Sequence, residues 1–236
     1  MPTVDTSTDL VRGAITHGPD TLVAWLNAGG PVLQILMGLS VLALTVTLLK
    51  LYQFARLSVW SDGGTREALE YWRENRPQEA IDSLGNTRNP VAEVVAATMQ
   101  RLQADPDPAT AREEAQRIAT DWLENLGRYL RILDVIGALS PLLGLLGTVL
   151  GMIDAFQQIQ AAGSQLDPGL LAGGIWEALL TTAAGLTVAI PTVAVLHGLE
   201  HLVDRVRHRM EDGLTRVFTR GTQSAPGAVE PVRGHY

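Results

Sequence analysis

The sequence predicts an all-α membrane protein with three transmembrane helices, of which the second and third extend far into the cytoplasm. Charged residues are absent from three stretches, 21–49, 135–153 and 178–196. Each stretch can cross a hydrocarbon core about 30 Å thick, because a helix rises about 1.5 Å per residue. A soluble helical protein of this length rarely contains three such runs, so the pattern favours a membrane protein over a soluble domain.

The distribution of lysine and arginine predicts the orientation of these spans. Of the 18 basic residues, one lies in 1–30, eleven lie in 50–134, none lies in 154–168 and six lie in 197–236. Because cytoplasmic segments carry the excess of basic residues, we expect the N-terminus and the 154–168 connection to face outside. The first apolar run lacks a preceding basic stretch and is longer than the core of a signal peptide, which predicts a retained anchor.

Capping signals divide the chain into seven expected segments. Asn89-Pro90 and Asp107-Pro108 each place a capping side chain before a proline, which is typical of a helix start. No strong stop follows Pro108 until Gly163, so one continuous helix is expected there. The segments are a periplasmic N-terminal segment over 1–30, a first transmembrane helix over 31–52, a cytoplasmic helical region over 53–107, a long helix with the second span over 108–158, a periplasmic turn over 159–167, a long helix with the third span over 168–220, and a disordered tail over 221–236.

Composition excludes several classes of site. With no cysteine, the chain can form no disulfide framework, thiolate metal site or haem attachment. No basic stripe accompanies the net charge of −7, so nucleic acid is not an expected partner. His197 and His201 have a spacing that can bind a metal, but at a membrane border we interpret them as interfacial residues. We therefore expect no metal, no cofactor, no catalytic residue and no enzyme activity.

Small residues form one face of each inner span, recurring every three or four positions. The residues are Gly137, Pro141, Gly144, Thr148, Gly151 and Ala155 in the second span, and Gly174, Ala178, Thr182, Gly185 and Ala189 in the third. Such faces let helices approach closely in lipid, where expulsion of water supplies no driving force. Helix packing alone is therefore one sufficient explanation of both faces.

Glu177 is the only ionisable residue in "LAGGIWEALLTTAAGLTVAIP", residues 171–191. A charged group at mid-bilayer on a lipid-facing helix costs about 2.5–3.5 kcal/mol on insertion scales. Neither inner span contains a lysine or arginine that could pair with it. A carboxyl group that changes between protonated and charged forms is what a proton path requires, and Thr181 and Thr182 follow it closely. The alternative is a permanently neutral Glu177 that hydrogen bonds between helices.

The stretch "SPLLGLLGTVLGMIDAF", residues 140–156, together with residues 171–191, resembles the ExbB/TolQ/MotA family of proton-channel subunits. The likeness is to ExbB and TolQ, since MotA proteins have four spans and a larger cytoplasmic domain. The resemblance implies a homopentamer in the inner membrane of a Gram-negative bacterium, with a periplasmic N-terminus and a cytoplasmic C-terminus. It also implies two single-span ExbD- or TolR-like partners in the central pore, each with an essential aspartate, and a TonB-like protein that receives the work.

The family's functional positions match residues of the two inner spans. Its pore threonine matches Thr148, its glutamate matches Glu177, and its second threonine matches Thr182, next to Thr181. The resemblance thus implies a proton pathway through these four residues. It also implies packing on the pore face by four small residues, Gly144, Gly151, Ala178 and Gly185. Because no aspartate lies deep in a span, conduction would need a second polypeptide.

Three functions remain open at the level of the sequence. The first is a motor subunit that uses the proton motive force to energise TonB-dependent outer-membrane transport. The second is a TolQ-like subunit of the Tol–Pal envelope machinery. The third is a non-conducting scaffold, for which the small faces serve packing alone and Glu177→Gln is silent. The motor hypothesis instead predicts that Glu177→Ala and Thr148→Ala abolish energised function in an assembled complex.

Overall fold

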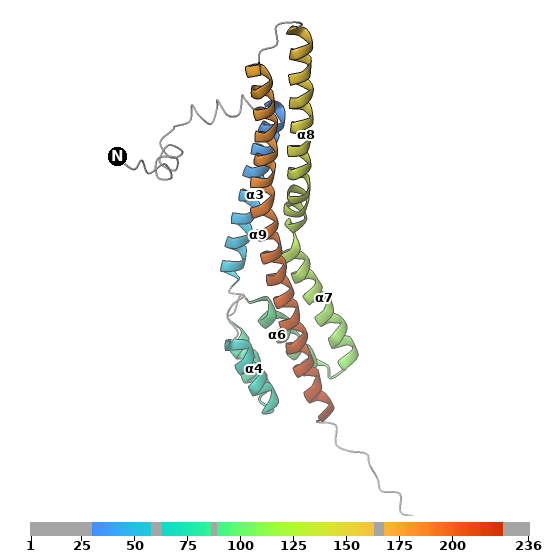
Figure 1. Cartoon of the computed structure of the whole chain (residues 1–236). Coiled ribbons are helices and arrows are strands. Elements are labelled where there is room, and N and C mark those ends of the chain that lie inside the picture. Colours follow the sequence, from blue (N-terminus) through green and yellow to red (C-terminus); the bar gives the residue numbers. More distant parts are fainter. Residues whose placement is uncertain (1–29, 58–62, 86–88, 163–167, 224–236) are drawn as a thin grey trace, which may run out of the picture. The chain divides into compact units, whose positions relative to one another are not determined.

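The predicted all-α fold is confirmed by a computed structural model that describes residues 30–57, 63–85, 89–162 and 168–223 (Figure 1). Within those ranges every regular element is a helix. The helices are α3 (Gly30–Arg56), α4 (Gly63–Arg73), α5 (Pro77–Leu84), α6 (Pro90–Ala104), α7 (Pro108–Gly127), α8 (Leu130–Ala162) and α9 (Pro168–Gln223). Most of the expected disordered tail (224–236), most of the N-terminal segment and much of the turn at 159–167 lie outside the described residues.

In the part of the chain that the structure describes, three stretches are long and apolar enough to cross a membrane, as predicted. They are Gly30–Arg56, Pro108–Ala161 and Ala172–Thr219. Large apolar side chains such as Leu44, Leu142 and Ile190 are exposed on these helices. Exposed apolar surface of this extent suits contact with lipid or with other transmembrane helices.

The chain forms two compact units. The first unit comprises Met1–Val46 and Arg131–Leu196, and the second comprises Thr47–Leu130 and His197–Tyr236. The first unit therefore contains the first part of α3, nearly all of α8 and the first part of α9, and the second contains the end of α3, helices α4 to α7 and the end of α9. Each unit is described by itself below.

Capping residues start the helices of the second unit where the sequence predicts. The Asn89 side chain accepts a hydrogen bond from the Val91 amide, and the Asp107 carboxylate accepts bonds from the Ala109 and Thr110 amides. Each proline that follows occupies the first helical turn, where its missing N–H has no intrahelical acceptor in any case. The core of this unit then forms around fully buried Val94, Val95 and Met99 of α6.

Tryptophan and glycine contacts attach α9 to this core. Trp72 Nε1 of α4 donates to the Val217 carbonyl at 3.3 Å. A Cβ added at Gly213 would lie 2.8 Å from Val95 Cγ2, so this glycine allows α9 to approach α6 closely. The amphipathic stripe on this part of α9 faces inward, because Val206, Met210 and Val217 are buried.

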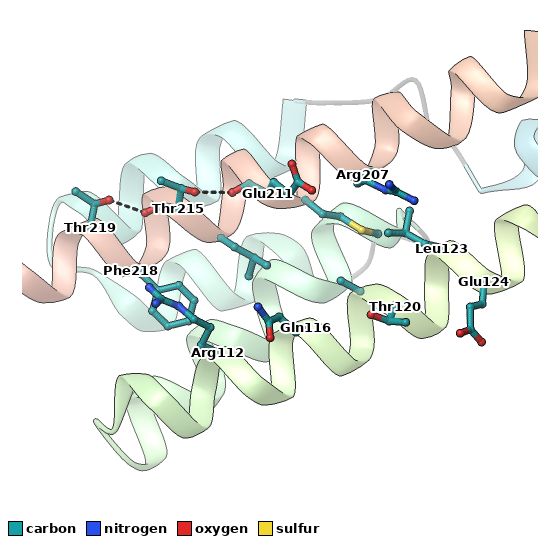
Figure 2. Close-up of a pocket in the computed structure, with 13 residues that line it drawn as sticks. Arg112, Gln116, Thr120, Leu123, Glu124, Arg207, Glu211, Thr215, Phe218 and Thr219 are labelled. Carbon is teal, nitrogen blue, oxygen red and sulfur yellow. Dashed lines mark hydrogen bonds between the residues drawn. The ribbon is translucent and has the colours of Figure 1, made fainter.

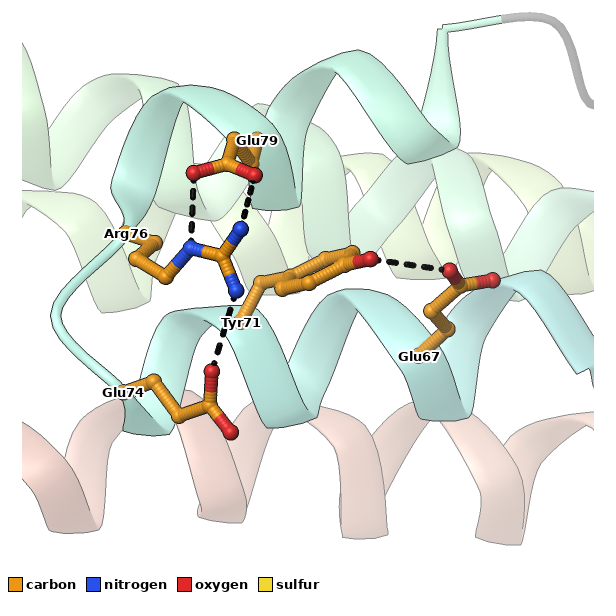
Figure 3. A network of polar contacts seen from close by, with 5 residues as sticks. All are labelled: Glu67, Tyr71, Glu74, Arg76 and Glu79. Carbon is orange, nitrogen blue, oxygen red and sulfur yellow. Dashed lines mark hydrogen bonds and ion pairs between the residues drawn. The ribbon is translucent and has the colours of Figure 1, made fainter.

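A polar network closes the turn between α4 and α5 (Figure 3). Arg76 donates to Glu79 and to Glu74, and its guanidinium lies 4.7 Å from the centre of the Tyr71 ring. Hydrogen bonds to Glu79 and then to Glu74 raise the pKa of Arg76. The hydroxyl of Tyr71 donates to Glu67, which raises the pKa of Tyr71. Because the four charged side chains of this network are solvent-exposed, the network orients the turn and contributes little stability.

The structure differs from expectation where one continuous helix was expected over 108–158. The chain leaves helical geometry at Arg128, whose ψ is 138°, and at Tyr129, whose φ is +71°. The expected helix is therefore two helices, α7 and α8. At its far end α8 continues to Ala162, and α9 continues to Gln223.

Candidate functional site

The candidate site lies along a seam between α8 and α9 in the first unit, and small residues form this seam. A Cβ added at Gly185 would lie 2.6 Å from the Ser140 carbonyl oxygen, and one at Gly151 would lie 3.1 Å from Ala178 Cβ. From one contact to the next along the seam, the residue numbers rise in α8 and fall in α9, so the two helices run antiparallel. The backbones approach this closely because no side chain longer than a methyl group separates them at these levels.

Two threonines of α9 share one acceptor on α8. Thr181 Oγ1 donates to the Ala178 carbonyl at 2.7 Å and lies 3.3 Å from the Gly144 carbonyl oxygen. Thr182 Oγ1 donates to the same Gly144 oxygen at 3.1 Å. Thr181 is buried, with 3% of its surface exposed, whereas Thr182 is half-buried. Thr181 is therefore a seam residue, and Thr182 stands at the seam's edge.

Thr148 is half-buried, and its hydroxyl donates to the Leu145 carbonyl within α8 at 2.7 Å. A threonine hydroxyl that donates to its own helix keeps its lone pairs available as acceptors. Thr148 can thus accept a hydrogen bond from a group outside the seam without losing the bond it already makes.

Thr148 and Thr182 lie on one flank of the seam, and Glu177 lies on the other. Successive helical residues are turned by about 100°. Ala178 and Thr181 of α9 point toward α8. Thr182, which follows Thr181, is therefore turned to one side of the seam, and Glu177, which precedes Ala178, is turned to the opposite side. In antiparallel α8 the same rotation turns Thr148 to the Thr182 side. The structure therefore brings the two threonines together and separates them from the glutamate.

Glu177 is exposed in the single chain. Among the described residues, its carboxylate has no hydrogen-bond or ion-pair partner. The next residue, Ala178, is 2% exposed and contacts Gly151, so Glu177 leaves the seam beside a tight contact. Its carboxylate is thus not locked inside its own chain.

Sequence reasoning missed several residues of the seam, among them Gly147 and Ser140. A Cβ at Gly147 would lie 2.4 Å from Thr181 Oγ1, and fully buried Ser140 presents its carbonyl to Gly185. Both lie one helical turn from residues that were predicted, which is the signal that could have identified them. The four predicted packing residues, Gly144, Gly151, Ala178 and Gly185, all contact the opposite helix of the same chain.

The second unit contains a separate groove between α7 and the end of α9, with a volume of about 950 Å³ (Figure 2). The Arg112 guanidinium lies 5.0 Å from the centre of the Phe218 ring at one end. On its α9 wall, Thr219 donates to the Thr215 carbonyl and Thr215 donates to the Glu211 carbonyl. None of the residues predicted for the proton pathway lines this groove.

No group of three or more His, Cys, Asp or Glu side chains is placed to hold a metal ion in the part of the chain that the structure describes. His197 Nδ1 lies 3.1 Å from Glu200 Oε2, three residues along the same exposed face of α9. The His197–Glu200 contact is thus an exposed side-chain pair.

Comparison with known proteins decides the family. The model of the MotA/TolQ/ExbB proton channel family matches residues 86–212, more than half of the chain. The chain belongs to the MotA/TolQ/ExbB proton channel family. This match spans the whole α8–α9 seam, including every residue of the candidate pathway.

Within this family, the chain is most similar to ExbB proteins. The biopolymer transport protein exbB1 of Vibrio cholerae serotype O1 is 36% identical over 184 residues, which cover 74% of this chain and 78% of that relative. The biopolymer transport protein ExbB of Salmonella typhimurium is 34% identical over 112 residues, which cover 46% of each chain. Family membership and three candidate spans together make this MotA/TolQ/ExbB protein a multi-pass membrane protein.

Proposed function

We propose that this protein is the multi-copy subunit of a proton-driven motor in the bacterial inner membrane, which energises TonB-dependent transport across the outer membrane. The N-terminus is periplasmic and the C-terminus cytoplasmic, and five copies surround a pair of single-span ExbD-like partners. A TonB-like protein receives the work. The similarity to biopolymer transport proteins named ExbB supports this role over the TolQ-like one.

The observation that carries the proposal is the unpaired, exposed carboxylate of Glu177 in an otherwise charge-free stretch of α9. A scaffold would gain nothing from a carboxyl group at this depth and would pay its insertion cost. A channel subunit gains a group that can exchange a proton with water or with a partner's acid. Exposure of Glu177 supports this second reading, because a neutral structural glutamate would be buried with a hydrogen-bond partner.

Thr148 and Thr182 supply the second part of the proposed pathway. Both hydroxyls lie at the edge of the seam, and both have acceptor capacity left after their own bonds. Thr181 is buried in the seam, where it holds α9 against α8. We therefore assign Thr148, Glu177 and Thr182 to proton transfer, and Thr181 to packing beside it.

A second polypeptide must complete the path. Within the charge-free stretches 135–153 and 178–196 the chain offers no aspartate at all. Proton-driven work requires a group whose charge changes in contact with both sides of the membrane in turn. The partner's aspartate fills this role in the proposed mechanism, and it approaches the hydroxyls of Thr148 and Thr182 from outside the seam.

The proposal is tested in the source bacterium with the chromosomal gene deleted and the wild type or a variant supplied in its place. Uptake of a TonB-dependent iron complex is measured with and without an uncoupler, and assembly is followed by native electrophoresis. Glu177→Ala, Glu177→Gln and Thr148→Ala are expected to abolish uptake while the complex still assembles. Glu200→Gln is the matched control, because it removes an exposed carboxylate of the same helix outside the charge-free stretch.

Three results contradict the proposal in different ways. Normal uptake with both Glu177→Gln and Thr148→Ala would remove these residues from the pathway and favour a scaffold. Normal uptake in the deletion strain, combined with a leaky or poorly constricting envelope, would favour the TolQ-like role. Purification of the assembled complex without any aspartate-bearing single-span protein would exclude the proposed partner.

A further inference from the structure

A buried lysine of α3 caps the end of α7. Lys50 is 2% exposed, and its ammonium donates to the Leu126 carbonyl at 2.9 Å and to the Asn125 carbonyl at 3.4 Å. Its third donor reaches Gln53 Oε1 at 3.0 Å. The three N–H groups of the ammonium therefore have three acceptors. All of these residues belong to the second unit.

The buried charge of Lys50 is compensated by a helix end. None of its hydrogen-bond acceptors is a carboxylate. The last carbonyls of a helix lack intrahelical donors and carry partial negative charge, so a cation there is stabilised. Leaving a buried ammonium without such partners is strongly unfavourable. Lys50 thus depends on α7 ending where it does, and the end of α7 depends on Lys50.

The two carbonyls that Lys50 binds are those that a continuous helix would use. In an α-helix the carbonyl of residue i accepts from the amide of residue i+4. An unbroken α7–α8 helix would therefore pair Asn125 with Tyr129, and Leu126 with Leu130. Neither backbone bond is present in this part of the described structure, where the last amide bond of α7 joins Arg128 to Glu124 at 2.9 Å. The lysine and the continuous helix compete for the same two oxygens.

The break also holds Tyr129 in an unfavourable backbone conformation. Its φ of +71° lies in the left-handed region, which bulky residues rarely adopt. A glycine would adopt this conformation without cost. The nearby Gly127 does not occupy the left-handed position, which falls on Tyr129 instead. The Tyr129 ring lies 5.9 Å from Lys50 Nζ, within the range of a cation–π contact. The junction therefore carries strain that Lys50 offsets and that a continuous helix would relieve.

We propose that Lys50 is a positioning residue, which holds the chain broken immediately before the helix that carries Thr148. The junction is a two-state element, with a broken state capped by Lys50 and a continuous state in which Tyr129 and Leu130 donate to the released carbonyls. The local sequence favours the continuous state, and the cation from α3 selects the broken one. The existence of this two-state junction does not depend on the proposed function. Only the activity measurement described below rests on the proposed function.

The experiment measures hydrogen exchange at the Tyr129 and Leu130 amides in the full-length complex, purified in lipid nanodiscs. Lys50→Met should slow the exchange of both amides by about tenfold or more, because each gains a helical acceptor. Lys50→Arg should leave exchange close to that of the wild type, because a guanidinium can donate to the same carbonyls. Arg56→Met is the matched control, because it removes an exposed cation from the same helix.

A double variant separates the two-state junction from simple destabilisation. Tyr129→Gly removes the strain of the broken state, so Lys50→Met/Tyr129→Gly should regain much of the fast exchange of the wild type. A general loosening of the fold would instead speed exchange in every variant. Unchanged exchange in Lys50→Met would overturn the proposal, and so would faster exchange at these two amides.

The activity measurement tests the positioning role. Lys50→Met should lower TonB-dependent uptake, and Tyr129→Gly should restore uptake in its background. If Glu177→Ala abolishes uptake while Lys50→Met leaves it normal, the positioning role is wrong and the proposed function stands. If no variant at Glu177 affects uptake, the proposed function fails, and the exchange result still decides whether the junction has two states.

Discussion

Gly185 of α9 lies so close to α8 that a Cβ at this position would be 2.6 Å from the Ser140 carbonyl oxygen. The nearest obstacles are backbone atoms, including the Gly144 Cα at 3.1 Å, so a side-chain rotation cannot make room. Gly185→Ala is therefore expected to push the helices apart and to lower the free energy of unfolding by about 1–3 kcal/mol. Equilibrium unfolding in mixed micelles measures this loss.

Gly198 provides the control for that substitution, because it lies in the same helix and a Cβ there would meet nothing within 4 Å. Gly198→Ala should raise the stability slightly, by up to about 1 kcal/mol, through its higher helix propensity. Equal effects at Gly185 and Gly198 would show that the seam is looser than the structure has it.

The hydroxyl of Thr181 should contribute measurably to the seam. Thr181→Val keeps the shape of the side chain and removes its donor to Ala178 and Gly144. We expect a loss of about 1 kcal/mol in the free energy of unfolding, the typical value of one hydrogen bond. Thr187→Val is the control, since the hydroxyl of exposed Thr187 donates to the Ala183 carbonyl of its own helix and does not bridge to α8. A loss at Thr187 as large as that at Thr181 would contradict the assignment.

The close contact between α6 and α9 predicts a compensating pair in the second unit. Gly213→Ala would place a methyl group 2.8 Å from Val95 Cγ2, and Val95 is completely buried. We expect a loss of about 1–3 kcal/mol in the free energy of unfolding. In Gly213→Ala/Val95→Ala the shortened side chain makes room, so the double variant should lose less than the sum of the single variants. Strict additivity would mean that the two residues do not touch.

Asp107 predicts a pH dependence of stability. Hydrogen bonds from the Thr110 hydroxyl, and then from the Ala109 and Thr110 amides, lower the pKa of Asp107. A carboxyl with a depressed folded-state pKa stabilises the fold above its unfolded pKa of about 4, and this contribution is lost as the pH falls through the folded value. The stability lost in Asp107→Ala should therefore be constant at neutral pH and shrink below about pH 4.

The three spans and the helix starts could be predicted from the sequence because their causes are local. A charge-free run of sufficient length identifies a span, and Asn89-Pro90 and Asp107-Pro108 cap the residues that directly follow them. The break at Tyr129 could not be predicted in this way. Leu126 is 76 residues from Lys50 in sequence, and the intervening segment gives no sign that they meet.

The candidate site could be predicted only in part, for a similar reason. Helical periodicity identified the small residues that meet across the seam, Gly144, Gly151, Ala178 and Gly185. It could not show that Thr181 is buried and Thr182 half-exposed, since the two are neighbours and the seam's centre depends on the partner helix. Gly147 and Ser140 were missed because the predicted faces contain only one residue per helical turn, whereas the contact between α8 and α9 is two residues wide.

The hydrogen bonds of Thr148 and Thr182 determine which ions and chemical groups can bind on their flank of the seam. Each hydroxyl has already given its only proton to a carbonyl, so both present lone pairs to whatever approaches. Lone pairs attract water, hydronium and an un-ionised acid, and they repel chloride and other bare anions. In the proposed pathway, the two uncharged hydroxyl oxygens of Thr148 and Thr182 would thus favour cations over anions.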